Sequence, residues 1–385
     1  MKLLIGGDFA PTKQNFDLFE QGDAEALYSS ELLNYLKTFD YRVFDFETVF
    51  EGKGTLIEKH GPLITTPVSC LPGINAINPN LFVLANNHIN NLGKEGIQHS
   101  FDILEQNNIA HVGAGVNLTQ AREPYILEHG ELKIGFYACA EHEFNAAGEQ
   151  KAGVNPYDPL ESFDDIRKAK TLCDYLIVFY HGGMIEYRYP LPTERRVFKK
   201  FVDAGADLVV GQHTHCIGCA ENYQGKTLLY GQGDFLFARP TLNEYRYSGL
   251  LLEVTIDKDG LRVDYNLRIK PQNTIRLATD KEKTEILGAF QLRGQEIQDQ
   301  KRYTEIYRTH LETRKGFYLD RLLGKFGRSL IYAGLNKLTS GRYRKWKMRR
   351  RFDKTDWLIL DNWVSCETHQ ELFRDMIQSE WQEKS

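Results

Sequence analysis

Two histidines separated by one residue follow a short apolar run, and such a pair can bind a metal ion or a phosphate. The run is Leu208–Val210, and the histidines are His213 and His215. Apolar residues without polar alternation are typical of a strand buried on both faces. Gly205 follows a helical pattern, at the place where a helix ends with positive φ. Helix, strand and histidine loop therefore form one αβ unit whose polar groups lie at the carboxyl end of the strand, where open α/β sheets bind ligands.

Taken alone, the pair is equally well explained as loop histidines hydrogen-bonded to backbone. The same arrangement recurs, however. Six strand-like runs end in groups able to bind metal or phosphate, namely Asp8, Glu47, Asn87 with His88, His181, His213 with His215, and Asp234. Strand ends of an α/β sheet share one edge, so we expect these side chains to converge. Mixed carboxylate and imidazole ligands suit Zn, Mn or Fe and exclude a purely oxygen-ligated calcium site.

The spacing of apolar residues predicts the elements that position these groups. Strands are expected at 3–5, 41–46, 81–85, 132–139, 174–180 and 226–230, helices at 23–39 and 94–106, and a hairpin over 248–269. Strands alternating with helices indicate an α/β fold. Residues 51–79 have no sustained period, so we expect a long loop over the site, with His60 inside it.

Length and charge indicate two domains. A chain of 385 residues is too long for one ordinary core. Residues 1–275 carry 25 Lys+Arg against 36 Asp+Glu, a balance of −11, whereas residues 276–385 carry 23 against 16, a balance of +7, and the two sum to −4. We therefore expect one domain over 1–275 and a basic helical extension over 276–385.

The lengths of the apolar runs and the distribution of the cysteines indicate the cellular compartment. No apolar run approaches the roughly 18 residues that cross a membrane. The opening run Leu3–Ile5 imitates a signal peptide, but Gly6 interrupts it and no small-residue cleavage site follows. A cytoplasmic protein is therefore expected, with peripheral membrane contact left open. The six cysteines are scattered, which indicates no disulfide framework. Cys216 and Cys219 could form a small zinc site with the histidine pair, although a loop thiol pair is the simpler interpretation.

Several short motifs occur in a specific order, although each is weak alone. The first set comprises Gly7-Asp8, Asn86-Asn87-His88, His181 and Gly211–His215. The second comprises Asp45-Phe46-Glu47, Leu84–His88, Gly113-Ala114-Gly115, Arg122-Glu123-Pro124, Asp203–Asp207 and Gly231–Phe235. The first set resembles the calcineurin-like metallophosphoesterases, and the second resembles their CapA-type branch, named for capsule and poly-γ-glutamate synthesis. The likeness covers roughly residues 1–270 and implies a metallophosphatase-like layered β-sheet core flanked by helices.

The resemblance implies two divalent metal ions, of Mn, Zn or Fe, clamping the attacking and leaving oxygens of a phosphoester. The implied ligands are Asp8 and His215 on one metal, Asn87, His181 and His213 on the other, and Glu47 as the bridge. His88 would protonate the leaving oxygen as a general acid. The residues expected to bind substrate are His60, Arg122 and Asp234.

Two positions depart from the superfamily pattern. Ala10 stands where a histidine is usual, and the bridging carboxylate is Glu47 where an aspartate is usual. Both are features of the CapA-type branch, yet they leave one metal short of a ligand. Catalysis therefore does not follow from the resemblance alone.

Residues 276–385 lie outside the resemblance. Leucines and a phenylalanine at helical spacing are typical of a helix packed on the catalytic domain, and they are Leu319, Leu322, Leu323, Phe326, Leu330, Leu335 and Leu338. Seven of the ten residues Arg342–Arg351 are Lys or Arg, with Tyr343, Trp346 and Met348 between them. A solvated basic face is the simpler interpretation. Contact with an anionic membrane, nucleic acid or an acidic polymer is the sharper one, and no specific nucleic acid is expected.

Together these features predict a metal-dependent phosphoester hydrolase-like protein of capsule, surface-polysaccharide or poly-γ-glutamate metabolism. The alternative is a non-catalytic accessory module that holds an anionic polymer or a membrane surface for a synthase. Absence of metal, or metal without turnover, would favour this alternative.

Overall fold

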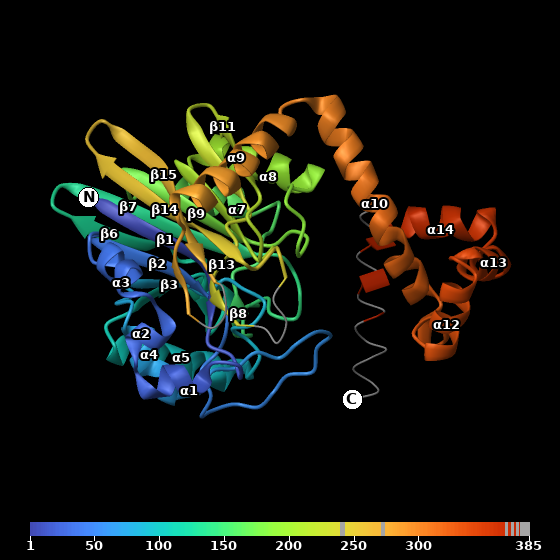
Figure 1. Cartoon of the computed structure of the whole chain (residues 1–385), viewed down its shortest axis with the longest axis horizontal. Coiled ribbons are helices and arrows are strands. Elements are labelled where there is room, and N and C mark those ends of the chain that lie inside the picture. Colours follow the sequence, from blue (N-terminus) through green and yellow to red (C-terminus); the bar gives the residue numbers. More distant parts are fainter. Residues whose placement is uncertain (239–242, 271–273, 366–368, 371–372, 375–376, 378–385) are drawn as a thin grey trace. The chain divides into compact units, whose positions relative to one another are not determined.

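Two β-sheets lie face to face in the first 300 residues of the computed structural model (Figure 1). The described residues are 1–238, 243–270, 274–365, 369–370, 373–374 and 377. The first sheet has the strand order β16-β15-β14-β1-β2-β3-β4, with β13 paired to β1. Its strands are β1 (Lys2–Ala10), β2 (Tyr41–Phe46), β3 (Leu81–Val83), β4 (Ala110–Val112), β13 (Asp234–Phe237), β14 (Ser248–Asp257), β15 (Gly260–Ile269) and β16 (Arg276–Leu277).

The second sheet has the order β11-β12-β10-β9-β7-β6. Its strands are β6 (Tyr125–His129), β7 (Leu132–Ala140), β9 (Tyr175–His181), β10 (Leu208–Gln212), β11 (Cys219–Tyr223) and β12 (Lys226–Tyr230), and a separate pair joins β5 (Ala114–Gly115) to β8 (Gly153–Val154). The central strands are apolar throughout because both of their faces are covered. Side chains from both sheets share one core, in which Tyr41 of the first sheet stacks on Phe136 of the second at 6.3 Å between ring centroids.

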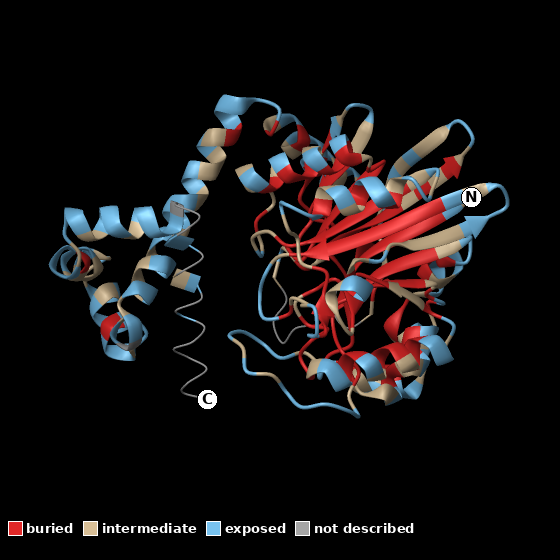
Figure 2. Cartoon of the chain, turned by 180° about the vertical axis from the view of Figure 1, so that it is seen from behind, coloured by how far each residue is buried: buried red, intermediate tan, exposed pale blue. Residues whose placement is uncertain are grey.

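Helices cover the outer faces of the two sheets. On the second sheet, α7 (Ser162–Lys170) contacts β7 and β9, and α8 (Pro192–Ala204) contacts β10 and β12. The helices and the 3-10 turn nearer the first sheet are α1 (Phe16–Gln21), α2 (Ala24–Leu27), α3 (Ser30–Leu36), η1 (Val68–Cys70), α4 (Leu71–Asn75) and α5 (Gly93–Gln106), whereas α6 (Leu118–Arg122) contacts β7 of the second sheet and the β5–β8 pair. Buried residues run along the strands and the inner helix faces (Figure 2). The expected layered α/β core flanked by helices is therefore confirmed.

One expected helix, over 23–39, is divided. Asp23 accepts hydrogen bonds from the backbone of Glu25 and Ala26 and begins α2, whereas Ser29 accepts one from Leu32 and begins α3. Two N-cap residues in one apolar stretch thus produce two short helices, since each cap satisfies the free backbone N–H groups of its own first turn.

The chain divides into two compact units, 1–300 and 301–385. The change of charge at 275 falls before β16 and α9 (Asp280–Glu296), which belong to the first unit. Phe290 of α9 packs on Tyr265 of β15 at 5.1 Å between ring centroids. The change in charge and the end of the first packed core therefore do not coincide.

The second unit is helical, as expected of the extension. Its helices are α10 (Gln300–Leu322), α11 (Gly324–Gly327), α12 (Leu330–Leu338), α13 (Arg342–Arg351) and α14 (Lys354–Ser365). Within the part of the chain that the structure describes, no helix has both the length and the hydropathy needed to cross a membrane.

Candidate metal centre

Strand register brings the polar groups to one edge. In the first sheet, Asp8 of β1 lies opposite Asp45 of β2 and Asp234 of β13, all in parallel pairs. In the second sheet, His181 of β9 lies opposite Gln212 of β10, directly before His213. Asp8 and His181 lie near the carboxyl ends of β1 and β9, whereas Asp234 is the first residue of β13, and the register makes these residues neighbours although they are far apart in sequence.

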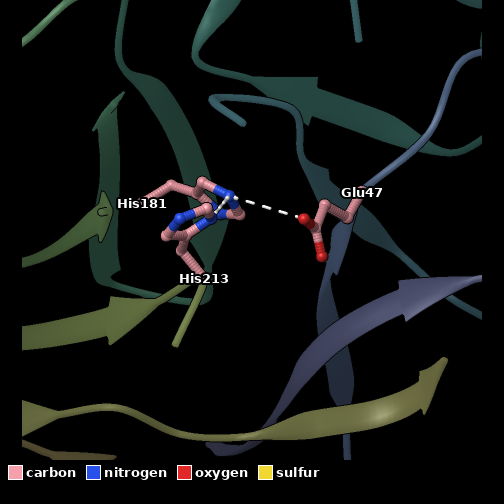
Figure 3. A group of neighbouring side chains, drawn as sticks. All are labelled: Glu47, His181 and His213. Atoms are coloured by element: carbon pink, nitrogen blue, oxygen red, sulfur yellow. Dashed lines mark hydrogen bonds and ion pairs between the residues drawn. The ribbon is translucent and has the colours of Figure 1, made fainter. Parts of the chain in front are cut away.

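The expected ligands form overlapping groups of buried acids and histidines. One group is Asp8, Glu47 and His215, and another is Glu47, His181 and His213. In each group the candidate ligand atoms lie within 4.8 Å of one another, and Glu47 belongs to both. Figure 3 shows the second group, with Glu47 facing His181 and His213. Glu47 Oε1 lies 3.7 Å from His181 Nε2 and 3.8 Å from His215 Nε2. This is the arrangement that a bridging carboxylate between two cations requires.

Asn87 and His213 complete the side of the cluster around His181. The Nε2 atom of His181 lies 3.2 Å from Asn87 Oδ1 and 3.1 Å from His213 Nδ1. Three ligand-type atoms therefore point to one place, the imidazole nitrogens of His181 and His213 and the amide oxygen of Asn87. A borderline divalent cation accepts such a mixture of nitrogen and oxygen.

Two aspartates orient the histidines from behind. Asp45 Oδ2 lies 2.7 Å from His181 Nδ1, and Asp234 Oδ1 lies 2.8 Å from His215 Nδ1. Because Nδ1 is occupied by the carboxylate, each ring turns its Nε2 toward Glu47. Metal-binding histidines commonly have such carboxylate partners, which fix the tautomer and the orientation of the ring.

The residues present fit a metal because Glu47 is buried without other partners. Among the described residues, neither carboxylate oxygen of Glu47 has a hydrogen-bond partner, and the side chain is fully buried. Burying a carboxylate without compensation is costly. A cation at the cluster would provide that compensation, so the donor set supports a divalent metal site without identifying the metal.

The pKa values of the cluster residues also fit a site that binds a cation. Burial raises the pKa of Glu47 to about 8. Burial lowers the pKa of His181 and of His215, but neighbouring carboxylates outweigh it and raise these values to about 9 and about 10. Burial and the two adjacent imidazoles keep the pKa of His213 well below its usual range. Without a cation the cluster thus shares protons, and metal binding must displace them.

His88 lies next to the cluster but is held differently from the candidate ligands. Its Nε2 lies 3.7 Å from Glu47 Oε1, and its Nδ1 lies 3.0 Å from the amide nitrogen of Asn91. That amide nitrogen also donates to the carbonyl of Ile64, which fixes its orientation as a donor. His88 Nδ1 therefore accepts, and the proton of the neutral ring is on Nε2, the atom that faces Glu47.

Two features of the backbone are unusual at the site, namely the positive φ angles of two histidines and a close contact at a glycine. His213 and His215 both have left-handed backbone, with φ of 87° and 53°. Such conformations cost on the order of 1–3 kcal/mol each and cluster at functional sites. Gly7 has no room for a side chain, because an added Cβ would lie 1.7 Å from the carbonyl oxygen of Gly233. This close approach holds β1, with Asp8, against the segment that leads into β13.

The three expected substrate residues lie in different surroundings. Asp234 supports His215 and also lies 3.5 Å from Arg246 Nη1. Arg122 forms ion pairs with Asp165 and Glu161, at 2.7 and 3.1 Å. His60 is exposed in the loop. The substrate-binding roles of all three stay predictions.

Sequence reasoning did not assign four residues that contact the site. They are Asp45, Asn91, Arg246 and Lys59, whose Nζ donates to the carbonyl of Asn87 at 2.7 Å. A signal existed for Asp45, because residues two apart in a strand share a face and Glu47 stands two positions later. Lys59 comes from an irregular loop, for which no periodic signal exists.

The alternative zinc site at Cys216 and Cys219 receives no support from the described residues. Both cysteines are buried and free, and no acid or histidine cluster within the described ranges includes either of them. Burial raises the pKa of the Cys216 thiol to about 11 and raises that of Cys219 as well. Zinc takes the thiolate, so zinc binding at this pair would first have to displace the thiol protons.

The sequence matches one family over most of its length. Residues 2–239 match the family described as bacterial capsule synthesis protein PGA_cap. The chain is 32% identical over 157 residues to the PGA biosynthesis protein CapA of Bacillus subtilis strain 168, covering 40% of this chain and 41% of that protein. It is 29% identical over 209 residues to a probable polyglutamine synthesis accessory protein of Mycobacterium tuberculosis H37Rv, covering 51% and 55%. The chain thus spans about half the length of the curated relatives that it matches.

Solved structures give only weak likenesses. A hypothetical protein of Thermus thermophilus aligns with a TM-score of 0.41 at 16% identity, over 69% of this chain and 99% of that one. A phosphatase of Mycoplasma pneumoniae aligns with a TM-score of 0.39 at 13% identity, over 71% and 90%. Likenesses at this level add nothing to what the fold itself shows.

Proposed function

The chain belongs to the bacterial capsule synthesis protein PGA_cap family, and from that membership we propose that it is a metal-dependent phosphoester hydrolase of capsule or poly-γ-glutamate synthesis. The observation that carries the hydrolase proposal is the pair of acid–histidine groups that share the buried, otherwise unpartnered Glu47. Paired metal sites with a shared ligand suit in-line displacement at phosphorus.

The proposed ligands are those that converge at the sheet edge. Asp8 and His215 would hold one cation, Asn87, His181 and His213 would hold the other, and Glu47 would be available to both. When bound, such cations polarise the phosphoryl oxygens and lower the pKa of water. Asp45 and Asp234 keep His181 and His215 in the tautomer whose Nε2 is free to coordinate.

His88 acts as the general acid in this proposal. Its Nε2 carries the proton, because Asn91 donates to Nδ1. The same Nε2 faces Glu47 at the cluster, where a leaving oxygen would depart. The Nε2–H of His88 would donate a hydrogen bond to the leaving oxygen as charge develops there, and water would replace the proton as it is transferred, so that the ring ends neutral. Positioned acid catalysis of this kind is worth roughly 10²–10⁴-fold in rate.

The test is a reconstitution assay on the full chain. The protein is stripped with a chelator, reloaded separately with Mn, Zn or Fe, and assayed with nitrophenyl and alkyl phosphate monoesters and diesters. We expect turnover to return with at least one metal, and His213→Asn to lower metal content and turnover together. His129→Asn, which changes an exposed histidine, is the matched control. A reloaded protein that holds metal but hydrolyses none of these esters would refute the hydrolase proposal.

One observation favours a second candidate, an accessory module without catalysis. Ala10 is buried at the end of β1. The metallophosphoesterases that the sequence resembles carry a histidine there, so one cation would have fewer ligands. The mycobacterial relative is itself named an accessory protein. Retention of metal and binding of poly-γ-glutamate, without turnover, would favour this candidate.

A further inference from the structure

The second unit exposes apolar side chains that a folded helix normally covers. On α12, Leu330 is 90% exposed, Ile331 75% and Leu338 84%. With 3.6 residues per turn these three share one side of the helix. Tyr332, 1% exposed, packs on another side, where its hydroxyl donates to Asp320 at 2.7 Å. The helix is therefore anchored by its tyrosine and presents its leucines and isoleucine outward.

Positive charge is concentrated in the same stretch. Residues 321–352 contain eleven Lys and Arg and no Asp or Glu. On α13, Arg344 is engaged by Asp320, with N–O distances of 2.6 and 2.8 Å. The other six cations of α13 pair with no carboxylate among the described residues, and they are Arg342, Lys345, Lys347, Arg349, Arg350 and Arg351. One arginine thus fixes the helix, and six cations are available to an external anion.

Aromatic residues accompany these cations. Lys347 and Arg350 lie over the ring of Trp346, at 5.2 and 5.1 Å from its centroid. Trp346 is 46% exposed, and Trp357 and Trp363 on α14 are 39% and 36% exposed. Apolar, aromatic and basic side chains together are the composition of helices that lie at a membrane interface, where tryptophan is enriched.

We propose that residues 301–385 bind the surface of an anionic lipid bilayer. The apolar side of α12 enters the headgroup region, and the six cations of α13 lie on anionic headgroups. An acidic polymer would neutralise the cations but leave Leu330, Ile331 and Leu338 in water. A second copy would bring two dense positive surfaces together. The bilayer alone matches both the charge and the apolar surface, and this activity lies outside the family match at 2–239.

The test uses the intrinsic fluorescence of the full chain. All four tryptophans, Trp346, Trp357, Trp363 and Trp381, lie in residues 301–385, so their emission reports on this unit alone. We expect a blue shift and co-sedimentation with phosphatidylcholine vesicles that contain phosphatidylserine, and much weaker binding to phosphatidylcholine alone. Binding should weaken between about 0.1 M and about 1 M salt, as the Debye length falls from ~10 to ~3 Å.

The charge variant is Arg349→Gln/Arg350→Gln/Arg351→Gln. Each cation near an anionic surface contributes on the order of fivefold to affinity, so the triple variant should bind on the order of 100-fold more weakly. The matched control is Lys133→Gln/Lys258→Gln/Lys281→Gln, which removes three exposed charges from the first unit. Equal loss in both variants would overturn the assignment to α13.

The apolar variant is Leu330→Ser/Ile331→Ser/Leu338→Ser. Because these side chains are exposed, the melting temperature should not change, whereas vesicle affinity should fall about 10-fold or more. Leu160→Ser/Leu172→Ser, at exposed leucines of the first unit, is the control. Binding to poly-γ-glutamate at least as tight as to vesicles and unaffected by the serines would replace the membrane with a polymer. Self-association that the serines abolish, without vesicle binding, would replace it with a second copy.

Discussion

The two units differ in which side chains they bury and which they expose. In the first unit, the carboxylates and imidazoles of the sheet edge are buried. His181 is paired with Asp45, and His215 is paired with Asp234. In the second unit, cations and leucines of α12 and α13 are exposed, and most of the cations have no carboxylate partner in the described chain. Burying charge and exposing apolar surface both cost free energy. These opposite arrangements are the basis of the two proposals, a small cation in the first unit and an anionic surface on the second.

The largest effect is expected from a substitution of His88, which tests whether the buried histidines of the first unit take part in catalysis. If the buried histidines serve chemistry, His88→Asn should lower turnover by roughly 10²–10⁴-fold while the metals are retained. The defect should shrink for nitrophenyl esters, whose leaving group needs no proton. Kinetics across leaving groups, paired with elemental analysis, measures this. If His88→Asn removes metal as fully as His213→Asn does, His88 is a ligand and the assignment fails.

A smaller effect is expected from the residue behind His181. Asp45→Asn replaces the carboxylate that orients the ring, and metal affinity should fall roughly 10- to 100-fold. Competition with a chelator of known affinity measures the change. Asp259→Asn, in the exposed turn between β14 and β15, is the control. Unchanged affinity in Asp45→Asn would mean that His181 needs no orienting partner.

Close backbone packing under the site predicts a stability effect. Gly7→Ala places a Cβ 1.7 Å from Gly233 O, which forces the strands apart. We expect a loss of about 1–3 kcal/mol in the free energy of unfolding, the usual range for overpacking. Gly288→Ala in α9 meets no atom within 4 Å and should be neutral or stabilising, since alanine favours a helix. Denaturant unfolding separates the two, and equal changes would contradict the packing explanation.

The smallest effect concerns pH and a buried carboxylate outside the cluster. Burial raises the pKa of Glu194 to about 8, while its carboxylate accepts from the backbone of Leu191 at 3.0 Å. A folded pKa above the unfolded value means that the folded state binds the proton more tightly. The contribution of protonated Glu194 to the free energy of unfolding is fully present below the unfolded pKa of about 4.5. It is lost as pH rises through the folded pKa of about 8.

Glu194→Gln should therefore remove that pH dependence. From about pH 5 to about pH 9 the wild type should lose roughly 1–3 kcal/mol more than the variant. Thermal unfolding across this range measures it, with Glu95→Gln at an exposed position as the control. Parallel pH curves for wild type and Glu194→Gln would show that the carboxyl is already ionised in the folded protein.

The convergence of the site residues was largely predictable, because runs of apolar residues locate the strands and therefore the polar residues at their ends. Apolar runs identified the strands, and parallel pairing brings their carboxyl ends together whatever the loops do. The sequence therefore predicted that Asp8, Glu47 and His181 meet. It could not predict that Lys59 contacts Asn87, because that contact depends on the path of an irregular loop.

The second unit was predicted less well. Leucine spacing suggested a helix over 319–338, but Gly324, with φ of 59°, separates α10 from the helices that follow. Periodicity identifies which residues share a face and not what covers it, and Leu330 and Leu338 are exposed. The expected packing of this stretch on the catalytic domain stays a prediction.

The central claim is that Glu47 joins two cations at the sheet edge, and the metal content of the purified full chain tests it most directly. Elemental analysis after reloading should find two divalent ions per chain in the wild type and a clear loss in Glu47→Gln. Glu58→Gln, an exposed glutamate of the nearby loop, should retain the wild-type content. A wild type that holds no metal after reloading, or a Glu47→Gln variant that holds as much as the wild type, would contradict the claim.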